Sequence, residues 1–116
     1  MAVQIWHNPR CSKSRQALKI VEDSGADVEI RRYLDDPPST GELDRVLKML
    51  GMEPIELARL NEGVAKEIGL KDKDLARQEW LEIMVRHPVL IERPIVIAAD
   101  GRAVLGRPPE AVKEVL

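Results

Sequence analysis

The stretch "RPIVIAADGRAVLGR", residues 93–107, decides the fold of this 116-residue chain. It opens with a β-branched run, reaches Asp100-Gly101, and continues with a second apolar run over residues 102–105. Two such runs joined by Asp-Gly predict a β-hairpin, because these two residues tolerate the positive φ angles of tight hairpin turns. The carboxyl-terminal part of the chain is therefore expected to contain two adjacent antiparallel strands.

The flanking segments extend the hairpin into two larger units. The proline pair at 108–109 fits the first turn of a final helix, which makes the carboxyl-terminal unit β-β-α. At the other end, "AVQIW" (2–6) and "VEIRRYL" (28–34) predict strands. Apolar residues at helical spacing from Ser12 to a stop at Gly25 predict a helix between them. This order favours a right-handed parallel β-α-β unit.

Helical sequence separates the two units, over about residues 38–91. Ser39 and Glu42 form a capping box at its first helix, and its last long helix ends before Pro88. The order β-α-β, helices, β-β-α is the layout of a thioredoxin-like core with an insertion. We therefore expect an α/β fold with a mixed sheet, in one domain over residues 1–116 that carries the helical insertion.

Composition limits the classes of function. The chain is 44% hydrophobic and 33% charged with a net charge of −2, so it is globular and has no overall basic field for nucleic acid. A single cysteine forms no internal disulfide, which fits a reducing compartment. We find no signal peptide or membrane-length apolar run. We expect a cytoplasmic monomer that binds neither membranes nor nucleic acid and has no metal site and no tightly bound cofactor.

The only cysteine lies in "HNPRCSKSR", residues 7–15, at the start of the first predicted helix. The unpaired N–H groups of a helix start favour the thiolate, which is the nucleophilic form, and Arg10, Lys13 and Arg15 add positive charge nearby. A lone cysteine is more often a small buried hydrophobe. Three basic neighbours are a poor setting for that, so we interpret Cys11 as a nucleophile.

Spacing excludes two familiar cysteine chemistries. A dithiol redox motif needs Cys-x-x-Cys, and here Ser14 takes the place of the second thiol. A cysteine phosphatase loop needs an arginine six residues after the cysteine, and that position is Ala17. Cys11 is therefore expected to act as a single thiol.

"HNPRCSKSR" resembles the active-site segment of the glutaredoxin-coupled arsenate reductases, a thioredoxin-like family that also includes Spx-type regulators. Four more segments resemble the family in family order: "IRRYLDDPPS", "ELARLNE", "HPVLIERPIVI" and "GRPPEAV". The resemblance covers nearly the whole chain. One departure is the pair after Cys11, where Ser12 and Lys13 stand in place of the small residues of the best-known members.

The resemblance implies a set of site residues. They are a catalytic Cys11, three oxyanion-binding arginines (Arg59, Arg93 and Arg107), and four supporting residues (His7, Ser14, Arg15 and Pro94). It also implies a cis peptide bond before Pro94. Two roles stay open: His7 either tunes the thiolate or orients the loop, and Ser14 either hydrogen-bonds the sulfur or serves the first helical turn.

The activity that the resemblance implies is arsenate reduction, which requires a second thiol from another molecule. Reducing arsenate to arsenite takes two electrons, and joining two thiols into a disulfide releases two. With one thiol in the chain, glutathione would be the co-substrate that supplies the second, and glutaredoxin would regenerate the enzyme by thiol–disulfide exchange. Two alternatives stay open: a glutathione-dependent thiol oxidoreductase of unknown substrate, or an Spx-like regulatory interaction protein.

Overall fold

A computed structural model describes residues 2–116 and contains the predicted hairpin. Strands β3 (Ile95–Ile97) and β4 (Ala103–Leu105) pair in antiparallel fashion. The turn between them needs a residue of positive φ, which Gly101 supplies with φ of 91°. The predicted hairpin is confirmed, and its two strands form one half of the four-stranded sheet.

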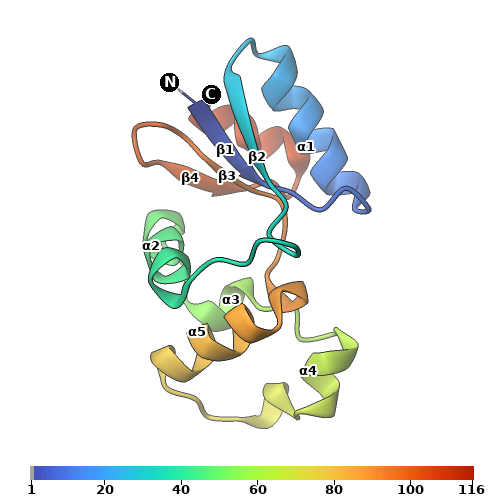
Figure 1. Ribbon diagram of the computed structural model, residues 1–116, viewed down its shortest axis with the longest axis vertical. Coiled ribbons are helices and arrows are strands. Elements are labelled where there is room, and N and C mark those ends of the chain that lie inside the picture. The colour runs from blue at the N-terminus through green and yellow to red at the C-terminus, as the bar shows by residue number, and fades with distance from the viewer. Residues whose placement is uncertain (1) are drawn as a thin grey trace. The chain divides into compact units, whose positions relative to one another are not determined.

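Two more strands complete a mixed four-stranded sheet (Figure 1). Strand β1 (Ala2–Trp6) pairs in parallel with β2 (Asp27–Arg31) and in antiparallel fashion with β3, so the order is β2-β1-β3-β4. In the register, Ile5 of β1 stands opposite Val96 of β3. The parallel pair and the hairpin thus share one sheet, as the expected α/β fold requires.

Strand β2 is shorter than the sequence predicts. The prediction of a strand over 28–34 is wrong beyond Arg31, where the chain turns. The N–H groups of Asp35 and Asp36 both donate to the carbonyl oxygen of Arg32, at 3.0 and 2.9 Å. Because the carbonyl of Arg32 accepts these turn hydrogen bonds, it does not take part in the hydrogen bonding of the sheet, and β2 ends before it.

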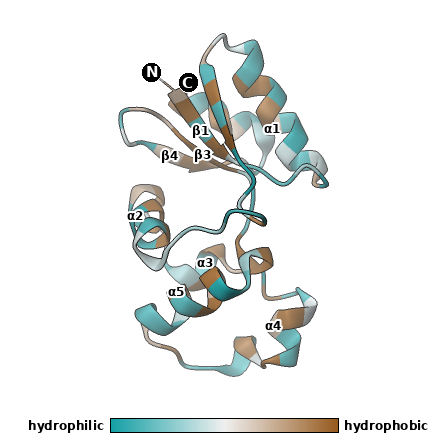
Figure 2. Cartoon of the chain, in the orientation of Figure 1, coloured by the Kyte–Doolittle hydropathy of each residue, from teal (hydrophilic) through white to brown (hydrophobic). Residues whose placement is uncertain are grey.

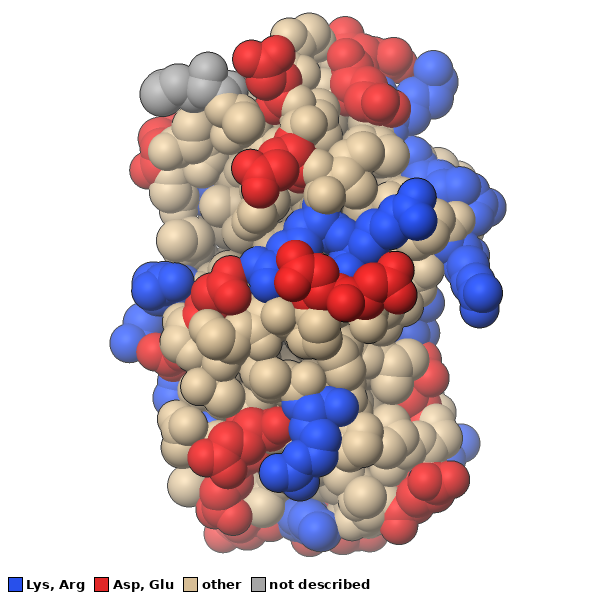
Figure 3. Space-filling view, viewed as in Figure 1, with Lys and Arg blue, Asp and Glu red and all other residues tan. Residues whose placement is uncertain are grey.

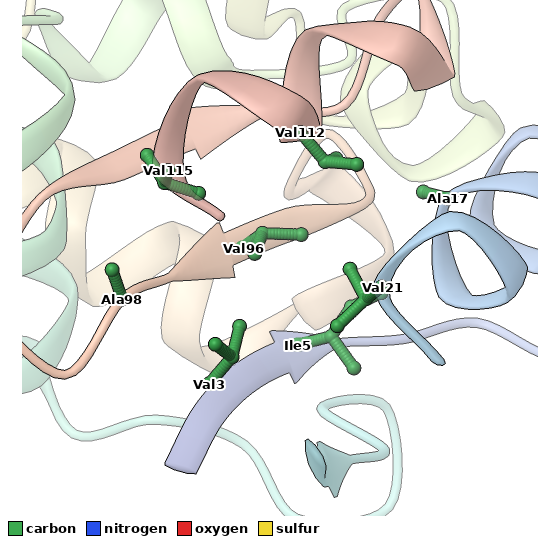
Figure 4. Packing of buried hydrophobic residues seen from close by; sticks show 8 residues of the cluster. All are labelled: Val3, Ile5, Ala17, Val21, Val96, Ala98, Val112 and Val115. Atoms are coloured by element: carbon green, nitrogen blue, oxygen red, sulfur yellow. The ribbon is translucent and has the colours of Figure 1, made fainter. Parts of the chain in front are cut away.

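Helix α1 (Ser12–Asp23) and the 3₁₀ helix η3 (Pro109–Val115) pack on the sheet. Both were predicted as helices, and the second takes the tighter form. Figure 4 shows their side chains directed at those of the central strands. The buried cluster consists of Val3, Ile5, Ala17, Val21, Val96, Ala98, Val112 and Val115. Burial of these apolar side chains joins both helices to the sheet.

The remaining helices lie in a second compact unit, Pro37–Glu92, which we call the helical unit. The sheet unit consists of the described residues up to Asp36 and from Arg93 onward. The elements of the helical unit are α2 (Thr40–Leu50), α3 (Pro54–Leu57), α4 (Gly63–Glu67), η1 (Leu70–Asp72), α5 (Arg77–Arg86) and η2 (Pro88–Leu90). The insertion expected at about 38–91 falls within the range of this unit and, as an insertion into a single domain, stays a prediction. The single-domain organisation stays a prediction.

The helical unit has its own apolar interior. The predicted capping box starts α2: Ser39 Oγ accepts the N–H of Glu42, and Glu42 Oε1 accepts the N–H of Ser39, both at 3.1 Å. In Figure 2 the helices carry hydrophobic and hydrophilic residues in alternating patches, as amphipathic helices do. The buried residues include Leu43, Val46, Leu47, Leu57, Trp80, Leu81 and Met84.

Charges of both signs are interspersed on the face seen in Figure 3, in keeping with the net charge of −2. Across residues 2–116, no helix has the length and apolar character that a membrane span requires.

Candidate active site

Cys11 is the N-cap of helix α1 and is partly exposed. Its backbone is extended (φ −95°, ψ 123°), its N–H donates to the carbonyl of Asn8, and its carbonyl accepts the N–H of Arg15, both at 3.0 Å. The thiol therefore lies at the helix start, where unpaired N–H groups and the helix dipole attract negative charge. The position predicted from the sequence is the one observed.

Arg107 brings a guanidinium to this thiol. Its Nη2 lies 3.7 Å from Cys11 Sγ, and its Nε donates to the carbonyl oxygen of Arg93 at 2.7 Å. The second bond holds the guanidinium in place from the segment that precedes the neighbouring strand β3. A guanidinium so placed attracts negative charge, both on the sulfur and on an oxyanion bound beside it.

Arg93 and Pro94 enter the same site through their backbone. The Arg93–Pro94 peptide bond is cis, which confirms the expectation from the resemblance, and the Arg107–Pro108 bond is also cis. The carbonyl of Pro94 accepts the N–H of Gly106 at 2.8 Å. The sheet unit thus brings together Cys11, the two arginines and Pro94, from segments far apart in the sequence.

Gly106 is a site residue that sequence reasoning missed. A Cβ atom at this position would stand 2.7 Å from Pro94 Cγ and 3.1 Å from Val112 Cγ1, so only glycine fits without displacing them. The signal in the sequence was a lone glycine between an apolar strand and Arg107. It could have been interpreted as a close backbone approach.

His7 and Ser14 form a buried pair under the cysteine loop. His7 Nδ1 lies 2.7 Å from Ser14 Oγ, and the same hydroxyl accepts the N–H of Asn8 at 3.0 Å. Both side chains are buried, with 5% and 0% of their surface exposed. Asn8, a residue that sequence reasoning did not single out, also accepts the N–H of Arg10 through Oδ1 at 3.0 Å. The pair therefore contacts the loop that carries Cys11.

The charge state of His7 follows from its surroundings. Burial lowers the pKa of His7 below its ordinary value of 6.5, the positive charges of Arg32 and Arg15 lower it further, and Glu22 opposes them. A neutral imidazole at pH 7 adds no positive charge to the thiol site. These contacts favour the interpretation that His7 orients the loop over the one in which it tunes the thiolate. The two roles considered for Ser14 stay predictions, and its hydroxyl contacts His7 Nδ1 and the N–H of Asn8.

Arg15 also supports the loop by hydrogen bonding. Its Nη1 donates to the carbonyl of Pro9 at 2.9 Å, across the segment that contains Cys11. The supporting role that the resemblance implies for Arg15 is compatible with this contact and stays a prediction.

Arg59 belongs to the helical unit and is held by two carboxylates. Its Nη1 pairs with Glu62 Oε1, and its Nε lies 3.5 Å from Glu92 Oε1. Its backbone N–H donates to the carbonyl of Leu90 at 2.7 Å. The two acidic partners were not predicted, and they surround an arginine that the resemblance assigns to oxyanion binding.

The fold and the thiol site define a thioredoxin-like α/β protein whose single cysteine lies at a helix start. The model of the ArsC family matches residues 6–115, and the chain belongs to that family. It is 42% identical to the arsenate reductase of Neisseria meningitidis, covering 98% of this chain and 97% of that protein. It is 41% identical to the arsenate reductase of Haemophilus influenzae, with 100% of both chains covered.

A solved structure agrees with these sequence relatives. The arsenate reductase from Vibrio cholerae matches with a TM-score of 0.94 at 44% identity, over 100% of this chain and 98% of that one. The predicted family and the thioredoxin-like fold class are therefore confirmed. The individual site roles stay predictions.

Proposed function

We propose that this protein is an arsenate reductase in which the Cys11 thiolate is the nucleophile. The observation that carries the proposal is the contact of Arg107 Nη2 with Cys11 Sγ, at 3.7 Å. It joins the one thiol of the chain to a planar, permanently charged donor suited to oxyanions. Relatives that are arsenate reductases, matched over nearly their whole length, support the same chemistry.

The proposed reaction balances with one thiol from the chain and one from solution. Cys11 Sγ attacks arsenic and a water leaves, which forms a sulfur–arsenic bond without a change of oxidation state. Glutathione then supplies the second thiol. The sulfur–arsenic bond breaks, two electrons pass to arsenic, arsenite leaves, and a disulfide between Cys11 and glutathione remains. Glutaredoxin removes the glutathionyl group by thiol–disulfide exchange and restores the Cys11 thiol.

In this scheme the Arg107 guanidinium stabilises the oxyanion, and the resemblance adds Arg93 as a second oxyanion ligand. Charge on the arsenate oxygens increases as the sulfur attacks, and fixed guanidinium donors stabilise that charge without reorganising. Glutathione is a co-substrate here, not a resident cofactor. The resemblance adds Arg59 as a third oxyanion ligand, a role that stays a prediction.

The experiment is an assay of arsenite production by the purified protein. The assay contains arsenate, glutathione and glutaredoxin, and the Cys11→Ser variant is the control for thiol-independent reduction. We expect sustained arsenite formation by the wild-type protein and none above background by the variant. An inactive wild-type protein would contradict the proposal. Glutaredoxin-dependent reduction of other disulfides without arsenite formation would instead favour the general thiol oxidoreductase.

A further inference from the structure

We infer that Arg10 and Lys13 form a basic surface beside Cys11 that selects glutathione, an anionic thiol, over neutral and cationic thiols. Both side chains are exposed, one just before the cysteine and the other in the first turn of α1. Both belong to the sheet unit, which also contains Cys11 and Arg107. The inference concerns the second reactant of the proposed reaction, and the oxyanion is not involved in it.

The charges of this surface are not neutralised by carboxylates. The sequence from residue 2 to residue 21 contains four lysines and arginines and no aspartate or glutamate. Within residues 2–116, neither Arg10 nor Lys13 forms an ion pair, whereas Lys19 of the same helix pairs with Asp23 at 3.3 Å. Figure 3 shows Lys and Arg side chains gathered along one edge, at the level of the loop that joins β1 to α1 in Figure 1. The positive potential beside the thiol is therefore left for an incoming anion.

Lys13 occupies a position that is unfavourable for its own helix. Helix α1 begins at Ser12, and its first turn contains no acidic residue. The helix dipole places partial positive charge at this end, so it repels a cation and attracts an anion. Folding alone therefore favours an acidic or neutral residue at this position. The lysine instead adds to the attraction that the helix start and Arg107 exert on an anion near Cys11.

Glutathione matches this surface by its charge. At neutral pH it carries more carboxylate than ammonium groups, and a carboxylate forms charge-assisted hydrogen bonds with both guanidinium and ammonium groups. Exposed charges of this kind act mainly by raising the rate of encounter. The choice of glutathione as the natural reactant rests on the proposed function, whereas the charge preference of the surface does not. The inference also gives a role to Lys13, which departs from the small residues of the best-known members.

The test compares three disulfides on the full chain: oxidised glutathione, which is anionic, bis(hydroxyethyl) disulfide, which is neutral, and cystamine, which is cationic. In each reaction the Cys11 thiolate bonds to one sulfur of the reagent, the disulfide bond of the reagent breaks, and the other half leaves as a thiolate. Mass spectrometry of quenched samples gives the rate constant, because Cys11 is the only thiol of the chain. Dividing by the rate constant of β-mercaptoethanol with the same disulfide removes the intrinsic reactivity of each reagent.

We expect the normalised rate constants to fall in the order anionic, neutral, cationic at low salt. The differences should shrink in about 1 M potassium chloride, where the Debye length is about 3 Å. In Arg10→Gln and in Lys13→Gln, the ratio of the anionic to the neutral rate constant should fall about threefold or more. The ratio isolates selection by charge, because a change in the thiolate population alters both rate constants equally.

Lys19→Gln is the matched control. It removes the same charge from the same helix, but from a side chain that Asp23 neutralises, and it should keep the wild-type ratio. A ratio lowered equally in Lys19→Gln would overturn the inference, because the net charge of the chain would then make the selection. Equal normalised rate constants for the three disulfides would also overturn it, as would a wild-type ratio in both Arg10→Gln and Lys13→Gln. No arsenate is present, so the charge preference is decided whether or not the protein reduces arsenate.

Discussion

Arg107 combines two contacts that no other side chain type can reproduce. Its Nη2 approaches Cys11 Sγ at 3.7 Å while its Nε donates to Arg93 O at 2.7 Å. The planar fork of a guanidinium allows both at once, whereas a lysine ammonium is a point charge on a flexible stem. We therefore expect the activity towards arsenate to depend on the orientation of the guanidinium as well as on its positive charge.

We predict that Arg107→Lys lowers kcat/KM for arsenate by about ten- to 150-fold, which corresponds to losing one charge-assisted hydrogen bond of roughly 1.5–3 kcal/mol. Steady-state kinetics at saturating glutathione and glutaredoxin measure the effect. Arg102→Lys is the matched control, because Arg102 is exposed and pairs with Asp100. An Arg107→Lys enzyme with wild-type kinetics would remove this guanidinium from the site.

The lowered pKa of His7 makes the free energy of unfolding depend on pH in a direction that can be predicted. Its pKa is lowered in the folded chain by burial first, then by Arg32 and Arg15. Below the ordinary value of 6.5, the unfolded chain binds a proton that the folded chain does not. The stabilisation by His7 is therefore complete above that pH and is lost as the pH falls through the folded-state pKa.

We predict that the free energy of unfolding, measured with urea at a series of pH values, falls less steeply below about pH 6.5 in His7→Gln than in the wild-type protein. The ring protons of His7, followed by NMR, should titrate with a midpoint below 6.5. A midpoint at or above that value would show that His7 is cationic near neutral pH, and would favour its role in tuning the thiolate.

At the scale of elements, the turn after β4 depends on a close approach. Because Cβ at Gly106 would stand 2.7 Å from Pro94 Cγ, we predict that Gly106→Ala lowers the free energy of unfolding by about 1–3 kcal/mol, as overpacking does. Urea unfolding measures this change. Gly63→Ala is the matched control, since nothing lies within 4 Å of its Cβ position. Equal stability of the two variants would contradict the packing argument.

Elements specified by neighbouring residues were predictable from the sequence. The capping box of Ser39 and Glu42 and the Asp100-Gly101 turn are each complete within a few residues, and both formed as expected. The end of β2 was not predictable from alternation, because it depends on two amide groups that turn back to one carbonyl, that of Arg32.

At the scale of the whole molecule, the site joins residues that local patterns do not connect. Cys11 and Arg107 are 96 positions apart, and only the resemblance to a family singled out that arginine. Glu92 escaped notice for the same reason, because its pairing with Arg59 depends on the chain returning alongside it. Local sequence thus predicts the thiol, its helix start and the basic residues next to it, and the fold adds the guanidinium of Arg107.

The most direct test of the single-thiol mechanism is a stoichiometric turnover without glutaredoxin. The wild-type protein is mixed with excess arsenate and glutathione, arsenite is counted, and the intact chain is weighed by mass spectrometry. We predict a burst of at most one arsenite per chain, glutathione attached to Cys11, and renewed turnover when glutaredoxin is added. Arsenite formed in the absence of glutathione, or a burst that leaves Cys11 unmodified, would contradict the account.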